Sequence, residues 1–317
     1  MTGDRHFREG GPADLRATFE LAVRSLVDAL VRSGVTPPRG MGEEGHVTED
    51  WSRQRGLIEF IAAQDHTKFW VCERNDELIG YVRVARFGRM DELTDLAVSP
   101  EHARMGVARG LLERCWPDPP SPELGRVVVT IGTPVDLTVY TRVGVMPATG
   151  HWHLRHRAEA YEERRALETV DAAEPAVHVL SPDRAVQEWK RLEPLAIGHD
   201  RPLLHEFFGR TRSCLACMDT EGRQAAALCW VSPEGEIGPG VGRTPEDLIP
   251  VVLAALDRVA KAQEPEVLAL YCTTDAWYLL DRLRRLGFHV YWPSWVMSSV
   301  PLPGLDRYLP TRPPRLL

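Results

Sequence analysis

The apolar residues of the chain follow two different spacings in turn. Over 12–33 and 51–63 they recur at every third or fourth position, the period of a helix with one buried face. The Gly- and Pro-rich stretch 34–45 between these helices predicts a loop. After residue 67 the period shortens to two, and β-branched and aromatic residues become frequent, which indicates strands. In the first half the pattern predicts strands at 68–74, 78–87, 91–98, 126–131 and 152–156, helices at 107–115 and 135–143, and a short opening strand near 6–8.

The order of these elements indicates the fold class. The segment 75–77 is short and polar enough to join two strands as a hairpin, so neighbouring strands are expected to pair antiparallel. Helices alternate with the later strands, and each helix has an apolar face to bury. We therefore predict an α/β (α+β) fold in which helices flank a mixed, mostly antiparallel sheet.

The second half of the chain repeats a similar order of elements. Between the halves, 158–176 is charged and poor in large apolar residues, which is typical of a helix that runs into a linker. In both halves a helix ends in Gly followed by an apolar residue, at Gly144 and at Gly287. We infer a diverged internal duplication, with domains at 1–165 and 175–317. The second domain is predicted to have helices at 182–195, 245–262 and 276–285 and strands at 214–218, 225–231, 237–241, 267–272 and 290–298.

Composition and charge narrow the class of protein. The 317 residues are 44% hydrophobic and 26% charged, as is usual for soluble globular proteins. The net charge of −7 disfavours a nucleic-acid partner, which would require a basic surface. No apolar run is long enough to predict a membrane span, and the N-terminus lacks an apolar signal region. The six cysteines lie in apolar stretches and indicate buried thiols, so we expect a cytoplasmic protein. The expected oligomeric state is a monomer or a homodimer.

The segment 93–110, LTDLAVSPEHARMGVARG, is the candidate binding site of the chain. Pro100 ends the preceding strand because it cannot donate to a β-ladder. A helix opens after it, and the small residues Gly106, Ala108 and Gly110 keep side chains off its first turn. Backbone N–H groups there can approach an anion closely, helped by the helix dipole. The alternative is an ordinary helix start whose small residues serve close packing.

Two further features of this segment point to one kind of ligand. Arg104 and Arg109 add positive charge beside the turn, which suits a pyrophosphate. The strand end at 96–98 offers backbone groups with which the two amides of a pantetheine arm could pair as an added strand. Together these features predict a site for coenzyme A.

The segment resembles the acetyl-CoA signature of the GNAT acyltransferase superfamily, written Q/R-x-x-G-x-G/A after a V-x-P turn. The chain has the turn at 98–100, then Gly106 and Ala108 at the glycine and at the small position. It departs from the pattern at Ala103, where the family has Gln or Arg and so one more side-chain contact. The resemblance covers 5–157 well and 177–300 in outline, which implies two tandem GNAT-like domains.

The resemblance also implies acetyl-CoA as the co-substrate, with no metal. In the family, the strand end holds the pantetheine and the acetyl carbonyl, and the turn after it holds the pyrophosphate. The acetyl-CoA residues implied here are Leu96, Ala97 and Val98 on the strand and Arg104, Met105, Gly106, Val107, Ala108 and Arg109 in the turn and helix start.

A second match to the family lies downstream, at Tyr140. This tyrosine stands four residues before Gly144, as in the family, although Thr133 occupies the position of the usual Asn. The family's tyrosine lies near the sulfur of coenzyme A and can protonate the leaving thiolate. A free tyrosine has a pKa of about 10, so it stays protonated at neutral pH and can make that donation. The alternative is a tyrosine packed in its helix with its hydroxyl at the surface.

An attacking amine must also lose a proton. Asp95 and Glu92 are the candidate catalytic bases, because they lie on the strand that would hold the acetyl group or just before it. Water could serve instead, and both carboxylates could be solvated residues of a strand edge. Positioning of the two substrates and polarisation of the thioester carbonyl by a backbone N–H could supply much of the rate.

The second half lacks these features. Glu246 and Asp247 in the first turn of the corresponding helix would repel a pyrophosphate, and Leu283 stands at the tyrosine position. The predicted function is therefore an N-acetyltransferase with its active site in the first domain, acting directly on a small-molecule or peptide amine. The alternative is a non-catalytic CoA-binding or regulatory module, which the two departures from the family pattern favour.

Three other groups of residues are candidate sites. Cys214 and Cys217 form a C-x-x-C pair, but no second Cys or His pair stands at zinc-finger spacing, so buried thiols are favoured. His151 and His153 would share one face of a strand, where they could line a substrate pocket, lie on the surface or bind a metal with a third ligand. The polar set at 197–208 could face the acceptor or reflect a helix cap.

Overall fold

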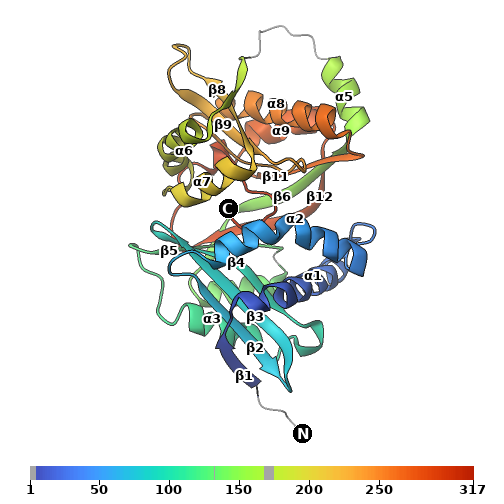
Figure 1. Cartoon of the computed structure of the whole chain (residues 1–317), viewed down its shortest axis with the longest axis vertical. Coiled ribbons are helices and arrows are strands. Elements are labelled where there is room, and N and C mark those ends of the chain that lie inside the picture. The colour runs from blue at the N-terminus through green and yellow to red at the C-terminus, as the bar shows by residue number, and fades with distance from the viewer. Residues whose placement is uncertain (1–4, 132, 168–174) are drawn as a thin grey trace. The chain divides into compact units, whose positions relative to one another are not determined.

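The computed structural model describes residues 5–131, 133–167 and 175–317, and the chain forms two compact units. Unit 1 comprises Met1–Met146 and Met297–Val300, and unit 2 comprises Pro147–Val296 and Pro301–Leu317. Each unit has strands flanked by helices, so the predicted α/β class is confirmed (Figure 1).

Unit 1 is built on strands in the order β1-β2-β3-β4-β5. Neighbours from β1 to β4 pair antiparallel, and β5 pairs parallel with β4. Every strand predicted up to residue 131 is present. The bounds are Arg5–Glu9 for β1, Lys68–Arg74 for β2, Glu77–Phe87 for β3, Met90–Val98 for β4 and Gly125–Thr130 for β5.

Helices cover both faces of this sheet (Figure 1). On one face, α1 (Leu15–Arg32) and α2 (Glu44–Ala62) pack apolar side chains against β2, β3 and β4. On the other face, α3 (Val107–Cys115) and α4 (Pro134–Arg142) enclose an apolar cluster with β3, β4 and β5, which we call the α3–α4 cluster. Short 3-10 turns precede α1 and α3, at Pro12–Asp14 and Pro100–His102.

Helix α2 begins earlier than the pattern predicts, at Glu44 instead of residue 51. Its first two turns are exposed or only partly buried, whereas the buried residues Leu57, Ile58 and Ile61 lie near its end. A helical period of apolar residues is absent where no face is buried, so the sequence indicates only the later part of this helix.

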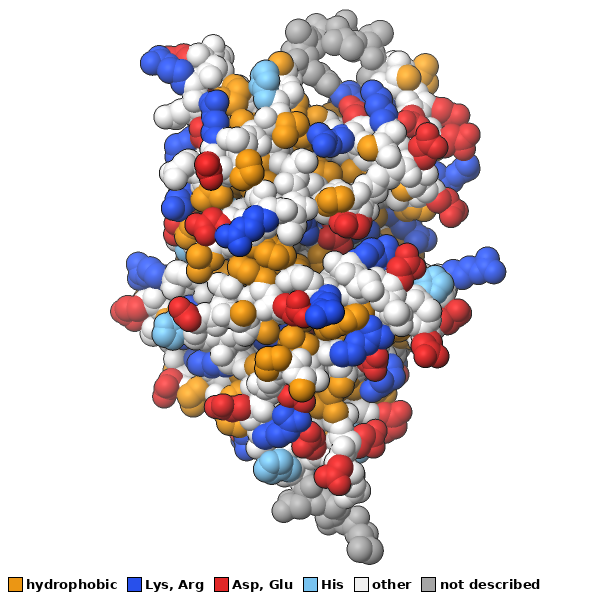
Figure 2. All heavy atoms as spheres, viewed as in Figure 1, with side chains coloured by type: hydrophobic (Ala, Val, Ile, Leu, Met, Phe, Trp, Pro, Cys, Tyr) orange, Lys and Arg blue, Asp and Glu red, His pale blue; other side chains and the backbone are white. Residues whose placement is uncertain are grey.

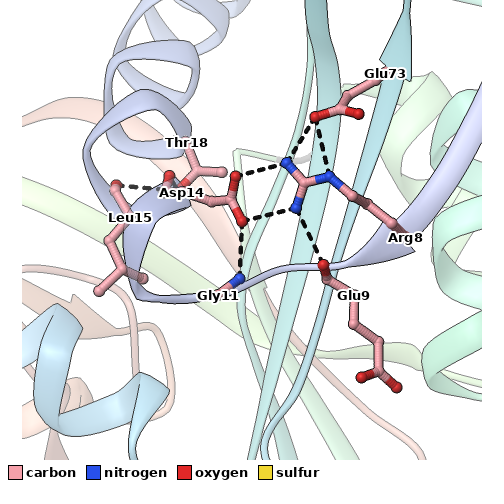
Figure 3. Close-up of polar contacts among 7 residues, drawn as sticks. All are labelled: Arg8, Glu9, Gly11, Asp14, Leu15, Thr18 and Glu73. Carbon is pink, nitrogen blue, oxygen red and sulfur yellow. Dashed lines mark hydrogen bonds and ion pairs between the residues drawn. The ribbon is translucent and has the colours of Figure 1, made fainter. Parts of the chain in front are cut away.

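Arg8 ties the start of α1 to the edge of the sheet (Figure 3). Its guanidinium lies 2.6 Å from a carboxylate oxygen of Glu73 on β2 and 2.7 Å from one of Asp14. Asp14 in turn accepts a hydrogen bond from the Gly11 N–H at 2.8 Å. The hydrogen bond from Arg8 lowers the pKa of Asp14, so this carboxylate stays charged and fixes the turn into α1 at neutral pH.

The strand predicted at 152–156 lies in unit 2. It is part of β6 (Met146–Arg157), which pairs antiparallel with β11 (Val267–Thr273). The compact units therefore divide the chain at Met146, whereas the boundary was predicted near 165–175. The period of a strand indicates which of its faces is buried but not which strand it pairs with. The sequence pattern therefore does not show that β6 pairs with β11 of unit 2.

A segment from far along the chain lies beside β5 in unit 1. Strand β12 (His289–Ser298) begins in unit 2, and Met297–Val300 at its end belong to unit 1. The Ser299 N–H donates to the Arg126 carbonyl at 2.9 Å, and the Arg126 N–H donates to the Ser299 hydroxyl at 2.8 Å. Met297 is fully buried in the α3–α4 cluster. Residues close to the other end of the chain thus complete unit 1.

Unit 2 has its strands in two groups. Besides β6, β11 and β12, its elements are β7 (Val177–Leu180), β8 (Ser213–Met218), β9 (Ala225–Val231), β10 (Ile237–Gly242), β13 (Tyr308–Leu309), α5 (Ala158–Ala166), α6 (Pro182–Ile197), α7 (Pro202–Thr211), α8 (Pro245–Gln263), α9 (Trp277–Arg285) and a 3-10 turn at Leu305–Arg307. One group has the antiparallel order β13-β10-β9-β8-β7, and the other has the order β12-β6-β11. Helix α8 packs against strands of both groups. The pattern predicts neither β7 nor β13, which are short.

The polar set predicted at 197–208 contributes to a buried ion network in unit 2. Arg201 lies 2.8 Å and His205 lies 2.9 Å from the carboxylate of Glu193, and all three side chains are fully buried. The Trp230 indole N–H donates to Nδ1 of His205 at 3.1 Å. Burial would raise the pKa of Glu193, but Arg201 and His205 hold it at about 2. The contacts of Arg201 and His205 therefore serve the packing of unit 2.

The distribution of charged side chains and the burial of the cysteines match what the composition predicts. On the face shown in Figure 2, positive and negative side chains are interspersed. Within the described ranges, no helix combines the length and the apolar character that a bilayer span needs. All six cysteines are buried free thiols, and Cys214 and Cys217 lie in β8.

We expect Met297→Ala in the full chain to lower the free energy of unfolding by about 2–4 kcal/mol, because it opens a cavity in the α3–α4 cluster. Urea denaturation followed by tryptophan fluorescence measures this change. The matched control is Met146→Ala, which truncates a side chain that is 53% exposed and should cost less than about 0.5 kcal/mol. Equal effects of the two substitutions would show that unit 1 does not depend on the 297–300 segment.

Candidate active site

An extra residue in β4 marks the point where this strand parts from β5. Leu93 and Asp95 pair with consecutive residues of β3, so Thr94 between them forms a β-bulge. The described parallel pairing of β4 with β5 ends at Leu93, one residue before the bulge. Strand β4 continues to Val98, so its last residues run on beyond the paired part.

The backbone of these last residues faces away from β3 at alternate positions. The Ser99 N–H donates to the carbonyl of Ile79 on β3 at 2.8 Å. Antiparallel pairs exchange hydrogen bonds at every second residue, so Ala97 faces β3 as Ser99 does. By the same alternation, the N–H and C=O groups of Leu96 and Val98 face the side from which β5 has parted.

Two contacts reduce the set of backbone groups that a ligand can reach. The Val98 carbonyl accepts a hydrogen bond from the hydroxyl of Ser25 on α1, at 2.7 Å. Ala97 is in register with Tyr81 of β3, so its backbone groups face β3 and not the side that a ligand could reach. Both groups of Leu96 and the N–H of Val98 therefore have the orientation that an added strand or an extended ligand requires.

The turn between β4 and α3 contains two residues in the left-handed conformation. Arg104 and Gly106 have φ angles of 62° and 81°, and Gly106 caps the N-terminus of α3. The first helical hydrogen bond runs from the Gly110 N–H to the Gly106 carbonyl at 3.0 Å. The N–H groups of 107–109 precede this bond and have no partner within the helix. They lie at the positive end of the helix dipole, which favours an anion.

The two glycines of this segment have different roles. A Cβ on Gly106 would have no closer neighbour than the Arg5 guanidinium at 3.6 Å, so the turn is open on that side. A Cβ on Gly110 would lie 2.8 Å from the ring of Phe7, so glycine there allows α3 to pack on β1. Only Gly106 has the properties of an anion site.

Two arginines lie near the turn in different ways. Arg109 is on the exposed side of α3 and pairs with Glu113, one turn later, at 2.7 Å. Arg5 on β1 donates a hydrogen bond through Nη1 to the carbonyl of Met105 in the turn. Sequence reasoning missed Arg5, because a pattern that predicts a strand does not show which distant turn the end of that strand touches.

Tyr140 on α4 is buried in the α3–α4 cluster, and its side chain forms a hydrogen bond with Thr130, the last residue of β5. Burial raises the pKa of Tyr140 and Asp136 adds to this rise, while the bond with Thr130 reduces it. The hydroxyl therefore keeps its proton through the neutral range. The side chain is 6% exposed, which excludes the alternative of a hydroxyl at the surface.

Thr133 caps α4. Its hydroxyl accepts a hydrogen bond from the Asp136 N–H at 3.3 Å, and the Asp136 carboxylate accepts one from the Thr133 N–H at 3.2 Å. This reciprocal capping box fixes the start of α4 and with it the position of Tyr140. The residue that departs from the family pattern thus has a clear local role.

Asp95 is held in a buried ion pair. Its carboxylate lies 3.0 Å from the guanidinium of Arg83, and both side chains are almost completely buried. The hydroxyls of Thr94 and Tyr81 donate to the same carboxylate at 3.0 and 3.2 Å. Both carboxylate oxygens of Asp95 are therefore engaged by neighbouring side chains.

Glu92 lies before the bulge, in the part of β4 that is paired on both sides. Its partners in register are Ala85 of β3 and Val127 of β5. Its side chain is 1% exposed. Since both Glu92 and Asp95 are buried, neither is a solvated residue of a strand edge.

The corresponding turn of unit 2 is closed by its own backbone. A Cβ on Gly242 at the end of β10 would lie 2.5 Å from the Thr244 carbonyl oxygen and 2.8 Å from the Leu248 nitrogen. Thr244 and Asp247 form a capping box at the start of α8, which adds a negative charge at this helix end. This turn therefore lacks the open side that Gly106 has in unit 1.

His151 and His153 are buried on β6. Nδ1 of His151 lies 2.7 Å from the Ser294 hydroxyl, and both imidazole rings stack on Tyr271 at centroid distances of 4.7 Å. Burial lowers the pKa of each histidine to about 3, so both are neutral at neutral pH. The surface alternative for this pair is wrong. In the part of the chain that the structure describes, no group of three or more His, Cys, Asp or Glu side chains is arranged to hold a metal ion.

Comparison with known proteins identifies the domain that contains this turn. Residues 65–142 match a family model described as an acetyltransferase (GNAT) domain. Among curated proteins, none matches the chain by sequence at a significant level. The matched residues include β4, the open turn, α3 and α4.

Solved structures resemble the whole chain in fold. A provisionally assigned acetyltransferase from Pyrococcus horikoshii has a TM-score of 0.68 at 13% identity, over 96% of this chain and 92% of that one. A tandem GNAT protein from the clavulanic acid biosynthesis pathway has a TM-score of 0.62 at 15% identity, over 94% and 99%. A GCN5-related N-acetyltransferase from Sphaerobacter thermophilus has a TM-score of 0.57 at 16% identity, over 93% and 95%. At these identities the likeness shows a common two-domain fold.

We expect Asp95→Asn to lower the free energy of unfolding by about 3–5 kcal/mol, because it leaves the Arg83 charge buried without its partner. Thermal and urea denaturation at pH 7 measure this loss. The control is Asp50→Asn, which removes a partly exposed carboxylate paired with Arg53 on α2 and should cost less than about 0.5 kcal/mol. A stable Asp95→Asn variant with altered turnover would instead favour a direct part for Asp95 in proton transfer.

Proposed function

Because residues 65–142 match an acetyltransferase (GNAT) domain, we propose that unit 1 transfers an acetyl group from acetyl-CoA directly to the amine of a small molecule or peptide. The observation that carries this proposal is the open turn at Gly106, directly after the part of β4 that has left its neighbour. A backbone with N–H groups on one side and a strand edge on the other fits a long ligand with a pyrophosphate and two amides.

The chain's own backbone would hold most of the co-substrate. The N–H groups of 107–109 would bind the pyrophosphate oxygens, and Leu96 with the Val98 N–H would pair with the pantetheine amides. Acetyl-CoA would supply the activated thioester. The closed turn after β10 supports one such site per chain, in unit 1.

Two proton transfers complete the reaction. Tyr140 donates its hydroxyl proton to the sulfur as the carbon–sulfur bond breaks, and burial keeps that proton in place until then. Glu92 or a water molecule accepts the amine proton as the new carbon–nitrogen bond forms. Asp95 is assigned a positioning role, because Arg83, Thr94 and Tyr81 already hold its carboxylate.

We expect Gly106→Glu to weaken acetyl-CoA binding by about 100-fold or more, because it places a carboxylate where the pyrophosphate would bind. Isothermal titration calorimetry of acetyl-CoA against the full chain measures this effect. The matched control is Gly106→Ala, which must adopt the same left-handed φ angle but adds no charge and meets open space. Equal affinity of the wild type and Gly106→Glu would remove the basis for the site.

A screen of amines with detection of free thiol separates transfer from binding alone. Release of coenzyme A with any amine supports the acetyltransferase. Tight binding of acetyl-CoA without thiol release for every amine class, from small polyamines to peptide N-termini, would support the non-catalytic CoA-binding module instead.

We expect Tyr140→Phe to lower kcat by about 100-fold while changing acetyl-CoA affinity less than about threefold, because it removes a proton donor and little contact area. Steady-state kinetics and calorimetry measure the two effects. Since burial raises the pKa of Tyr140, the wild type should retain its turnover up to and beyond pH 10.

The control for Tyr140→Phe is Tyr161→Phe in unit 2, which removes another buried tyrosine hydroxyl, hydrogen-bonded to Asp257 at 2.7 Å. It should lower stability without lowering kcat. Unchanged turnover in Tyr140→Phe would mean that another group or the solvent protonates the thiolate.

A further inference from the structure

We infer that Arg5, on the first strand of unit 1, supplies a cation to the pyrophosphate site in place of the side chain that is missing at Ala103. The inference rests on the proposed acetyl-CoA site. It assigns a binding residue that lies outside the signature segment and is separated from the turn by about a hundred residues of sequence.

The signature segment itself carries positive charge at Arg104 and Arg109, but not at position 103. Ala103 has no donor at the position where the family carries Gln or Arg. The Arg109 guanidinium is directed along α3 to Glu113, at 2.7 Å, and its side chain is 74% exposed. An arginine so engaged has part of its charge already compensated and points away from the turn.

The position of Arg5 meets the need. Its Nη1 donates to the Met105 carbonyl, inside the turn, and lies 3.6 Å from the place where a Gly106 Cβ would stand. That place is the open side of the turn, next to the N–H groups of 107–109. Strand β1 brings Arg5 there because its pairing with β2 places Arg5 opposite Arg74, at the end of the sheet where β4 also ends.

The chemistry of the guanidinium suits a second partner. An arginine side chain has five N–H donors in a planar fork, and the Met105 carbonyl uses only part of them. The remaining donors can bind phosphate oxygens, and charged donors form stronger hydrogen bonds than neutral ones. The bond to Met105 also restricts the side chain, so less of its freedom is lost when an anion binds.

The test compares Arg5→Gln with Arg5→Lys by calorimetry, with coenzyme A as the probe. Glutamine removes the charge and is shorter than arginine, whereas lysine keeps the charge and most of the length, so the pair of variants tests the charge of Arg5. We expect Arg5→Gln to weaken binding about tenfold or more, and Arg5→Lys to weaken it less. Arg109→Gln should weaken it less than Arg5→Gln does.

Two controls define the effect. Arg53→Gln removes the same charge from the surface of α2 and should leave the affinity within about twofold. S-acetylpantetheine, which has no phosphate, should react with the same kcat/KM in the wild type and in Arg5→Gln if the residue serves the phosphates alone. Raising the salt concentration should narrow the difference in coenzyme A affinity between the two proteins.

The outcomes separate the two proposals. If the wild type does not bind coenzyme A, the proposed acetyl-CoA site itself fails. If the wild type binds and Arg5→Gln binds equally well, the inference on Arg5 fails and the proposed function stands. A loss of S-acetylpantetheine turnover in Arg5→Gln would also overturn the inference, because it would show that Arg5 acts through the shape of the turn.

Discussion

The β-bulge at Thr94 is the constraint on which the candidate site depends. One extra residue redirects the strand, and the described parallel pairing stops at Leu93. Strand β5 ends soon afterwards at Thr130, which binds Tyr140. The unpaired end of β4, which would bind the ligand, and Tyr140, the proposed proton donor, are therefore both found where β4 and β5 stop pairing.

The buried ion pair of Asp95 explains which neighbour β4 keeps. Asp95 is the first residue after the bulge, and its partner in register on β3 is Arg83. A buried charge pair is costly to separate, and the Arg83 guanidinium also lies over the ring of Phe69 at 4.7 Å. These contacts fix β4 to β3 where it leaves β5. The ion pair of Asp95 is therefore important for the geometry of the site.

The sequence predicts the parts of this molecule that depend on neighbours along the chain. The helix start at Val107, the strand before it and the helix that carries Tyr140 follow from local patterns, and the family resemblance depends on that same segment. Contacts between distant segments leave no such signal. Periodicity does not encode which strands pair, and three features depend on that pairing. They are the hydrogen bond from Arg5 to Met105, the ion pair of Asp95, and the burial of His151 and His153.

The placement of Met297–Val300 beside β5 has a consequence for biosynthesis. Arg126 and Ser299 are 173 residues apart in sequence, so the partner of β5 is made long after β5 itself. At a synthesis rate of about 5–20 residues per second, unit 1 waits roughly ten seconds or more for its last strand, with part of its apolar core exposed to the solvent or to chaperones. Closing so long a loop is also slow. The part of the protein that is translated first is therefore completed among the last, and a ribosome that stops before residue 297 releases a unit 1 without its edge.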